Sequence, residues 1–356
     1  NNKRIKRIMA YSPITKASNF FTPTLYVGNG STKTVTGIPF EPDMTWIKNR
    51  VGATDNEIYD KVRGVGYRIY TNTSAGQDNL GSQGLSAWTS DGFTVGNNGA
   101  LNGNGNNQVS WNWKANGSGS ANTDGSINST VSVNTTSGFS IVNYTGNGTS
   151  GAYVGHGLGV VPGTVLVKRL DASDYWIMYN RNLNTSPGNY YIRLNDNGAP
   201  AAFTGMWNDT APTSSSFYLG NSASTNASGG NYIAYCFSEV QGYSVTGRYR
   251  GNANASDGTF VNCGFRPSMV IQKRLDGTDN WFIFDDKRDG FNEDNEYLFP
   301  NLTQAESSGI NRVNLLSNGF KLMTTDGGNN ANGGPYLYMA FGQTLVGSNN
   351  MPANAR

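Results

Sequence analysis

Residues 264–288, GFRPSMVIQKRLDGTDNWFIFDDKR, hold the densest group of side chains in this chain that could do chemistry. The window contains five basic and four acidic residues, although only 14% of the whole chain is charged. Two facing carboxylates would suit glycoside hydrolysis, and a mixed cluster of charges would suit a ligand site. The same residues at the ends of strands would instead serve the architecture of a sheet.

The pattern of this window occurs twice more, in residues 40–64 and 159–181. Each copy runs from a proline through a short apolar strand to Lys48, Lys168 or Lys273, and then through a turn to a second apolar strand, Asp or Asn, and Arg. Catalytic groups are seldom triplicated at matching positions, whereas fold determinants often are. The pattern therefore predicts partly exposed ion pairs that fix strand register and contribute about 0.5–1 kcal/mol each.

Three further blocks surround every copy of the pattern in the same order. They are an upstream strand (25–31, 138–150, 242–254), a downstream strand (91–96, 216–220, 318–323) and a closing aromatic strand (108–114, 232–238, 336–342). Short β-branched and aromatic runs between Gly, Asn, Asp and Ser turns, at about six to eight strands per roughly 100 residues, are typical of antiparallel sandwiches. The chain is therefore predicted to be all-β, with three tandem antiparallel β-sandwich repeats.

The repeats set the expected domain boundaries. They are 1–19 for an N-terminal arm, 20–114 for repeat 1, 115–137 for a Gly/Ser/Asn linker, 138–241 for repeat 2, 242–342 for repeat 3 and 343–356 for a polar C-terminal tail. The linker is expected to carry at most one short strand, at Ile127–Val133. Each repeat is expected to have its own core, so that removal of repeat 1 leaves the other two folded.

Overall composition narrows the classes of partner. The net charge of +2 does not favour nucleic acid or an anionic membrane. No apolar run approaches the roughly 18 residues of a membrane span, and the basic N-terminal stretch lacks the apolar segment of a secretory signal. Cys236 and Cys263 lie in apolar strand-like runs, which predicts free buried thiols rather than a disulfide framework.

His156 is the only histidine of the chain, and it could serve as a catalytic base. It lies in VGHGLGVVP without a nucleophile motif, which favours a structural histidine in a turn. One histidine and two cysteines argue against a transition-metal site, and no cofactor is expected. The acidic turn 285–296 could offer oxygen ligands to Ca²⁺, but its spacing is not that of an EF-hand, so a solvated loop is favoured.

Aromatic rings at the surface could stack on sugars. Most tryptophans are expected in the core, because this large side chain is usually buried. Trp207, in FTGMWNDTAP, has a loop-like context and is expected to be the most exposed ring. Tyr190 and Tyr191 are the other candidates for glycan stacking.

Several of these motifs also resemble a known family. In order along the chain, they are NFFTPTLYVGNGS, PDMTWIKNR, DKVRG, DGFTVG, VSWNWKANGSGSANTDGSI, GFSIVNYTGNG and GHGLGVVP. They are similar to repeat-containing structural proteins of bacteriophages, a family common in marine phages, and the similarity covers nearly all of the chain. Its strand pattern also resembles jelly-roll or concanavalin-like sandwiches, an analogy of fold alone.

The resemblance implies a non-enzymatic virion protein of a tail fibre or similar surface appendage that contributes to host attachment. Three sandwiches in series would form a rigid rod, and many copies in a homo-oligomer, expected to be a trimer, would give weak sites avidity for a bacterial surface glycan. Other virion proteins are the expected partners, and the candidate arm toward them consists of Lys3, Arg4, Lys6 and Arg7. A solvated tail is the alternative for this arm. The alternatives for the whole chain are a capsid-surface decoration protein, a secreted carbohydrate-binding module and a polysaccharide depolymerase.

Overall fold

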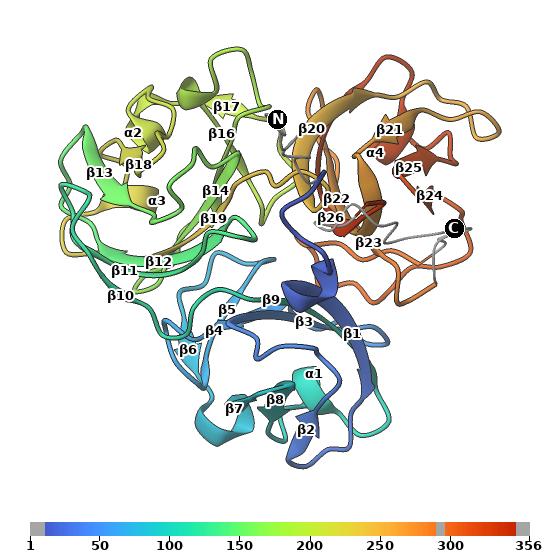
Figure 1. Cartoon of the computed structure of the whole chain (residues 1–356), viewed down its shortest axis with the longest axis horizontal. Coiled ribbons are helices and arrows are strands. Elements are labelled where there is room, and N and C mark those ends of the chain that lie inside the picture. Colours follow the sequence, from blue (N-terminus) through green and yellow to red (C-terminus); the bar gives the residue numbers. More distant parts are fainter. Residues whose placement is uncertain (1–10, 290–295, 347–356) are drawn as a thin grey trace, which may run out of the picture.

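The computed structural model describes residues 11–289 and 296–346, which form three lobes around a common centre (Figure 1). Antiparallel β-sheets make up nearly all the regular structure, which confirms the all-β class. Helices within the described residues are single turns: α1 (Gly99–Asn102), α2 (Thr204–Trp207), α3 (Ala223–Asn226), α4 (Gly327–Asn330), and the 3-10 turns η1 (Ala17–Asn19), η2 (Gly81–Gln83) and η3 (Pro187–Asn189). No helix in this part of the chain could span a membrane.

Lobe 1 pairs a six-stranded sheet with a three-stranded one. In spatial order the large sheet consists of β1 (Phe21–Val27), β9 (Asn107–Trp113), β3 (Met44–Asn49), β4 (Glu57–Asp60), β5 (Tyr67–Tyr70) and β6 (Asp78–Asn79). The small sheet consists of β2 (Lys33–Val35), β8 (Gly92–Val95) and β7 (Leu85–Thr89).

Lobe 2 pairs an eight-stranded sheet with a two-stranded one. The large sheet consists of β10 (Ser120–Asn122), β11 (Ser129–Asn134), β12 (Phe139–Thr145), β19 (Asn231–Phe237), β14 (Thr164–Arg169), β15 (Ile177–Asn180), β16 (Tyr190–Arg193) and β17 (Ala201–Ala202). The small sheet consists of β13 (Ala152–Gly155) and β18 (Ser216–Leu219). The segment expected to be a linker with at most one short strand thus contributes two strands, β10 and β11, to the edge of this lobe, and β11 overlaps the strand predicted at Ile127–Val133.

Lobe 3 repeats the arrangement with a four-stranded and a three-stranded sheet. The large sheet consists of β20 (Ser244–Arg250), β26 (Pro335–Thr344), β22 (Phe265–Arg274) and β23 (Phe282–Asp285). The small sheet consists of β21 (Phe260–Asn262), β25 (Gly319–Leu322) and β24 (Val313–Leu316).

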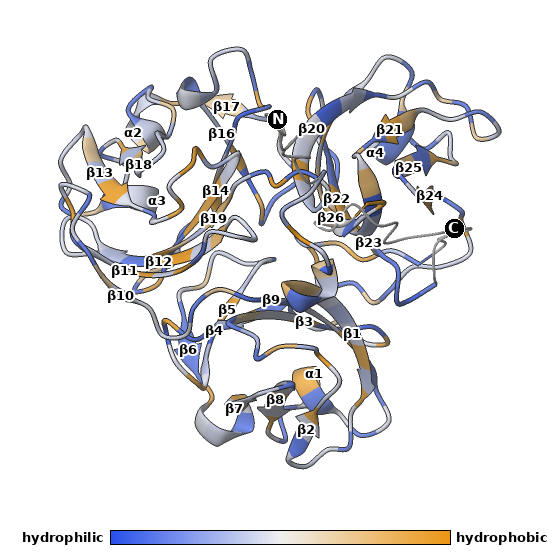
Figure 2. Cartoon of the chain, viewed as in Figure 1, coloured by the Kyte–Doolittle hydropathy of each residue, from blue (hydrophilic) through white to orange (hydrophobic). Residues whose placement is uncertain are grey.

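Each lobe encloses a hydrophobic core between its large and small sheets. Hydrophobic residues concentrate in the strands, and hydrophilic residues concentrate in the outer loops (Figure 2). Representative buried residues of these cores are Tyr59, Leu85 and Phe93 in lobe 1, Val165, Trp207 and Phe217 in lobe 2, and Val270, Phe284 and Phe320 in lobe 3. Separate cores were expected from the repeats.

A fourth core, which the repeats did not predict, joins all three lobes at the centre of the molecule. The ring of Trp113 lies 6.3 Å from that of Phe237 and 5.7 Å from that of Phe341, and the last two rings lie 5.5 Å apart. These residues occupy matching register positions on β9, β19 and β26. The central strands of the large sheets, such as β3, β14 and β22, are therefore covered on both faces. The lobes close into a ring instead of following one another as a rod (Figure 1).

Candidate functional site

The three lysines of the repeated pattern are fully buried, so the expectation of partly exposed groups is wrong. Lys48 Nζ donates to the carbonyl oxygen of Thr54 at 2.8 Å and to that of Thr303, in lobe 3, at 3.1 Å. Burial lowers the pKa of Lys48 to about 8. The lysine thus links its own turn to the neighbouring lobe.

The other two lysines occupy the same environment. Lys168 Nζ donates to the carbonyl oxygens of Asp174 and Ser74, each at 3.0 Å, and Ser74 belongs to lobe 1. Lys273 Nζ donates to the carbonyl oxygen of Arg274 at 2.7 Å. Burial lowers the pKa of both lysines to about 8. Their donors are directed at backbone carbonyls, so the lysines hold their own turns together, and Lys48 and Lys168 also bind a neighbouring lobe.

A second set of matching positions also reaches across the interfaces between lobes. Trp176 Nε1 donates to the carbonyl oxygen of Tyr70 at 2.7 Å, from lobe 2 to lobe 1. Trp281 Nε1 donates to the carbonyl oxygen of Arg193 at 3.0 Å, from lobe 3 to lobe 2. Lobe 1 has Asn56 at this position, and its side-chain amide donates to carbonyls of lobe 3. Trp281, central to the charged window, therefore serves an interface.

The acidic positions of the pattern are Asp60, Asn180 and Asp285, and each contacts the next lobe. The hydroxyl of Tyr235 donates to Asp60 Oδ2 at 2.7 Å, and Trp111 Nε1 donates to Asp285 Oδ2 at 3.0 Å. In the third interface, Asn180 Nδ2 donates to Thr246 Oγ1 at 2.8 Å, so both partners are uncharged. One position of the fold thus makes a polar contact in all three interfaces.

Arginine completes this contact in two of the three lobes. Arg63 Nε lies 2.5 Å from Asp60 Oδ2, and Arg288 Nε lies 2.7 Å from Asp285 Oδ2, with all four side chains nearly or fully buried. Lobe 2 has the buried Leu183 in place of the arginine. The pairs are therefore interior features, and the value of about 0.5–1 kcal/mol for exposed pairs does not apply to them.

One further ionic network joins lobe 1 to lobe 3. Arg288 Nη1 lies 3.0 Å from Glu306 Oε2, and Arg50 Nη2 lies 2.7 Å from Glu306 Oε1. Arg50 also pairs with Glu296 at 2.7 Å. A carboxylate that accepts from two guanidinium groups is fixed in orientation, which suits a structural contact.

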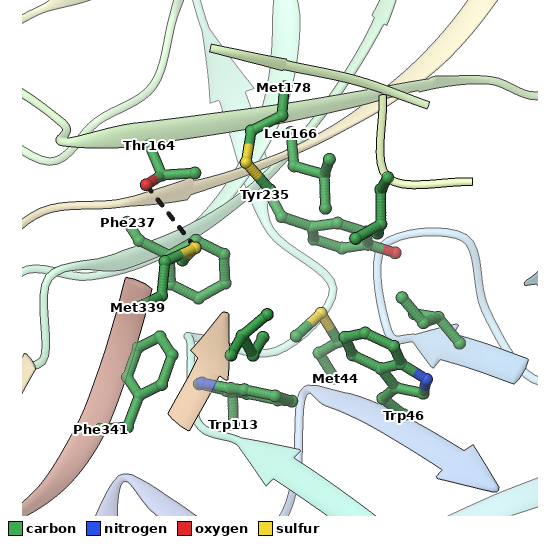
Figure 3. A pocket seen from close by; sticks show the side chains of 13 residues that line it. Met44, Trp46, Trp113, Thr164, Leu166, Met178, Tyr235, Phe237, Met339 and Phe341 are labelled. Carbon is green, nitrogen blue, oxygen red and sulfur yellow. Dashed lines mark hydrogen bonds between the residues drawn. The ribbon is translucent and has the colours of Figure 1, made fainter. Parts of the chain in front are cut away.

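The centre of the molecule holds a small cavity where the three lobes meet (Figure 3). Its volume is about 30 Å³, and its walls are almost entirely apolar. Thr164 supplies a hydroxyl, but this donates to Met339 Sδ at 3.8 Å, as the dashed line in Figure 3 shows. A space of this size holds one or two waters at most and has no polar partners for them. The cavity is a packing gap and not a ligand pocket.

The residues proposed for glycan stacking do not form one surface. Trp207 is only 2% exposed, because the single turn of α2 folds its ring into the core of lobe 2, 6.1 Å from the ring of Tyr179. Its expected exposure is therefore wrong. Tyr190 and Tyr191 are half-buried, but Tyr190 packs against the central core and Tyr191 against the core of lobe 2. Neighbouring residues of a strand point to opposite faces, so the two rings cannot form a joint platform.

Other predicted positions have simple outcomes. His156 is buried in a turn, with Nε2 at 3.1 Å from the carbonyl oxygen of Thr213 and Nδ1 accepting from the backbone N–H of Leu158 at 3.1 Å, and burial lowers its pKa. These contacts with the backbone fit the structural histidine that the sequence favoured. Cys236 and Cys263 are free thiols. The candidate arm Lys3, Arg4, Lys6 and Arg7 lies outside the described residues.

The acidic turn 285–296 is only partly within the described residues, which exclude 290–295. Asp285, at its start, is bound by Arg288 and Trp111. Within residues 11–289 and 296–346 there is no group of three or more His, Cys, Asp or Glu side chains that could hold a metal ion. The described part of the turn therefore offers no preformed calcium site.

A pair of tyrosines that sequence reasoning missed lies on the outside of lobe 2. Tyr153 on β13 and Tyr218 on β18 are cross-strand partners, with ring centroids 5.6 Å apart and ring planes 38° apart. Tyr153 is 36% exposed and Tyr218 is half-buried. The signal was the alternation in AYVG and SFYLG, where the tyrosines stand between buried neighbours. Together they form the tyrosine platform.

Comparison with known proteins gives a family without an assigned activity. Residues 16–344 match a family described as a domain of unknown function (DUF7483). The match runs through all three lobes, so the family unit is the whole ring. No curated protein and no solved structure matches the chain.

Proposed function

Because the chain belongs to the DUF7483 family of domains of unknown function, we propose from its own residues that it is a non-catalytic structural protein of a bacteriophage virion. In this role it forms part of a tail fibre or similar surface appendage and contributes to host attachment. The resemblance of its repeated motifs to phage structural proteins supports a location in the virion. The contacts of its charged residues support a non-catalytic role.

One observation carries this proposal: the charged residues that most resemble catalytic groups hold the three lobes together. Lys48 and Lys168 bind backbone carbonyls across an interface, and Asp60 and Asp285 bind a buried arginine and an aromatic donor of the next lobe. A general acid or base must reach the proton that it transfers. These groups instead have neighbouring lobes as their partners.

The proposal includes a finer description of the fold. The three lobes are copies of one β-sandwich unit, of jelly-roll or concanavalin-like type, that share a central core. The matching registers of β3, β14 and β22 against β9, β19 and β26 support common descent of the lobes. Closure into a ring buries both faces of the central strands of each large sheet, which favours a stiff body suited to a particle surface.

The working form in this proposal is a homo-oligomer, with a trimer as the expected state, bound to other virion proteins. Multiple copies would turn weak contacts with a bacterial surface glycan into stable attachment. The outer faces of the small sheets and the loops remain available for such contacts, because the large sheets are occupied by the lobe cores and the central core.

Location in an intact particle is the direct test. Antibodies against the purified chain, detected by gold labelling in electron microscopy of purified particles, are expected to mark the tail or its fibres. Labelling of the head would favour a decoration protein, and the lack of the chain in particles would overturn a virion role. Incubation of the purified chain with host surface polysaccharide is expected to release no shorter products, and their release would overturn the non-catalytic assignment.

A further inference from the structure

The outer faces of the small sheets differ among lobes at one matching pair of positions. The cross-strand pair is Thr34 with Thr94 in lobe 1, Tyr153 with Tyr218 in lobe 2, and Phe260 with Lys321 in lobe 3. In lobe 1 the two hydroxyls lie 3.0 Å apart. Since the same sheet forms with threonines, the fold itself does not require two tyrosines in lobe 2.

The sheet beneath the tyrosine platform is rigid. The residues between and beside the tyrosines, Val154 and Phe217, are completely buried in the core of lobe 2. The backbone N–H of Tyr153 donates to Ser126 Oγ at 2.9 Å, which ties the strand to a neighbouring loop. The two rings are therefore held side by side before any ligand arrives, which reduces the entropy lost on binding.

A polar wall stands at one end of the tyrosine platform. Residues 153 and 155 of β13 point to the same side of the sheet, about 6.8 Å apart along the strand. At Gly155 a Cβ atom would lie 1.9 Å from Asn122 Oδ1 and 3.0 Å from the Cβ of Asp124, so only glycine lets these side chains lie over the strand. Asn122 Nδ2 donates to Asp124 Oδ2 at 2.9 Å, and Asp124 is exposed.

This combination matches the requirements of a sugar ring. The C–H groups on one face of a pyranose are weakly positive and pack against the negative face of an aromatic ring, while its hydroxyls need hydrogen-bond partners at the rim. Asp124 Oδ1 and the amide of Asn122 are suitable partners for hydroxyl groups. The three surrounding segments, 120–127, 150–156 and 213–220, contain no Lys or Arg, and Asp124 is their only carboxylate. An acidic sugar would therefore be repelled.

We propose that the tyrosine platform, with Asn122 and Asp124, is a binding site for a neutral pyranose of a glycan. Tyr153 and Tyr218 stack on the ring, and Asp124 accepts a hydrogen bond from a hydroxyl group. The inference rests on the proposed role in host attachment, for which it names the chemical class of the ligand and the lobe that binds it.

The test is calorimetric titration of the full chain with neutral hexasaccharides of glucose, mannose and N-acetylglucosamine, and with an acidic hexasaccharide of galacturonate. At least one neutral probe is expected to bind, and the acidic probe is expected to bind more weakly. Tyr153→Thr combined with Tyr218→Thr, which installs the residues of lobe 1, should lower the affinity at least about tenfold. Tyr153→Phe combined with Tyr218→Phe keeps both rings and should retain binding.

The matched control is Phe260→Thr combined with Lys321→Thr, which makes the same change on lobe 3 and should leave the affinity within about twofold of the unmodified chain. The inference is overturned if no neutral probe binds, if the threonine variant of lobe 2 binds as well as the unmodified chain, or if the lobe 3 variant loses binding equally. If the chain binds a neutral sugar but is absent from particles, the sugar site stands and the virion role is overturned. If the chain is found in particles but binds none of the neutral probes, the virion role stands and the sugar site is overturned.

Discussion

The centre of the molecule and the outer faces of its small sheets differ in how far the three lobes agree. At the centre, Trp113, Phe237 and Phe341 place an aromatic ring at the same position in every lobe. On the outer faces, Thr34 and Tyr153 occupy one matching position with different chemistry. A central residue must fit its own sheet and a neighbouring lobe, whereas an outer residue must fit only its own sheet. Matching positions with the same residue chemistry in all lobes are therefore interpreted as architectural, and matching positions whose chemistry differs are candidates for binding.

Removal of lobe 1, residues 20–114, breaks the centre most severely. The sequence alone predicted that lobes 2 and 3 would remain folded, but the structure leads us to expect the opposite. Trp176 and Tyr235 of lobe 2 lie in the central core and would lose their lobe 1 partners, which would expose a large apolar face. Scanning calorimetry of the fragment should show no cooperative transition. A sharp transition near that of the intact chain would show that the central core is dispensable.

A buried ion pair of an interface should be the next most sensitive feature. Arg288→Ala leaves Asp285 buried without its cation and should lower the free energy of unfolding by about 3–5 kcal/mol. Arg181→Ala, which breaks the more exposed pair with Glu239, is the control and should cost less than about 1 kcal/mol. Urea denaturation measures both changes.

Lobe 2 also shows how to replace such a pair. Asp60→Asn combined with Arg63→Leu copies Asn180 and Leu183 into lobe 1. The double change should cost less than Asp60→Asn alone, because no unpaired buried cation remains. An additive cost for the two substitutions would contradict the structural equivalence of the lobes.

The buried lysines predict a rise in stability on the alkaline side. Their folded pKa of about 8 lies below the value of about 10.4 in an unfolded chain, so the unfolded state binds more protons in this window. The free energy of unfolding should therefore increase with pH above about 8, by about 2–3 kcal/mol for each lysine. Burial raises the pKa of tyrosines such as Tyr179 to about 12, which reverses the trend above about pH 10.

Lys168→Met isolates one of these contributions. The variant should show about two thirds of the rise between about pH 8 and 10, because two of the three lysines remain. Denaturation at several pH values measures the slope, and Lys33→Met, on the small sheet of lobe 1, is the control. A slope equal to that of the unmodified chain would mean that Lys168 keeps an ordinary pKa in the fold.

Glu57 is a single group, so its effect should be smaller than that of the three lysines together. It sharpens the comparison because the next lobes have Ile177 and Phe282 at its position. Burial raises the pKa of Glu57 to about 7, although Arg68 at 2.9 Å opposes the shift. The folded state then holds a proton that the unfolded chain has released, so stability falls as the pH rises from about 4.5 to 7, by about 2–3 kcal/mol.

Glu57→Gln cannot lose that proton and should flatten the fall in stability over this range. The measurement is the difference in the free energy of unfolding between the variant and the unmodified chain, at about pH 5 and pH 7. Asp78→Asn, which changes the more exposed acid bound to Arg68, is the control for a general loss of negative charge. If the difference in the free energy of unfolding between the variant and the unmodified chain is the same at the two pH values, Glu57 is not the group that holds the proton.

The sequence by itself determined the all-β class, because strand and turn signals are local. It predicted a threefold repetition because these signals recur in the same order. The interpretation of His156 as a structural histidine rested on the same local evidence, and its backbone contacts fit it. The sequence also indicated that the charged pattern is architectural, since that pattern recurs together with the strands. These conclusions required no knowledge of which lobes touch.

Only the tertiary structure decided how deeply these residues are buried and what they contact. Lys168 looks like the end of an exposed strand until Ser74, 94 positions earlier, is brought to its ammonium group. Trp207 looks like a loop residue until α2 turns its ring inward. The tyrosine platform likewise forms only when β13 and β18 pair, which brings together Tyr153 and Tyr218, 65 positions apart. Contacts between distant segments depend on which strands pair within a lobe and on how the lobes close into a ring, and a local pattern of residues specifies neither.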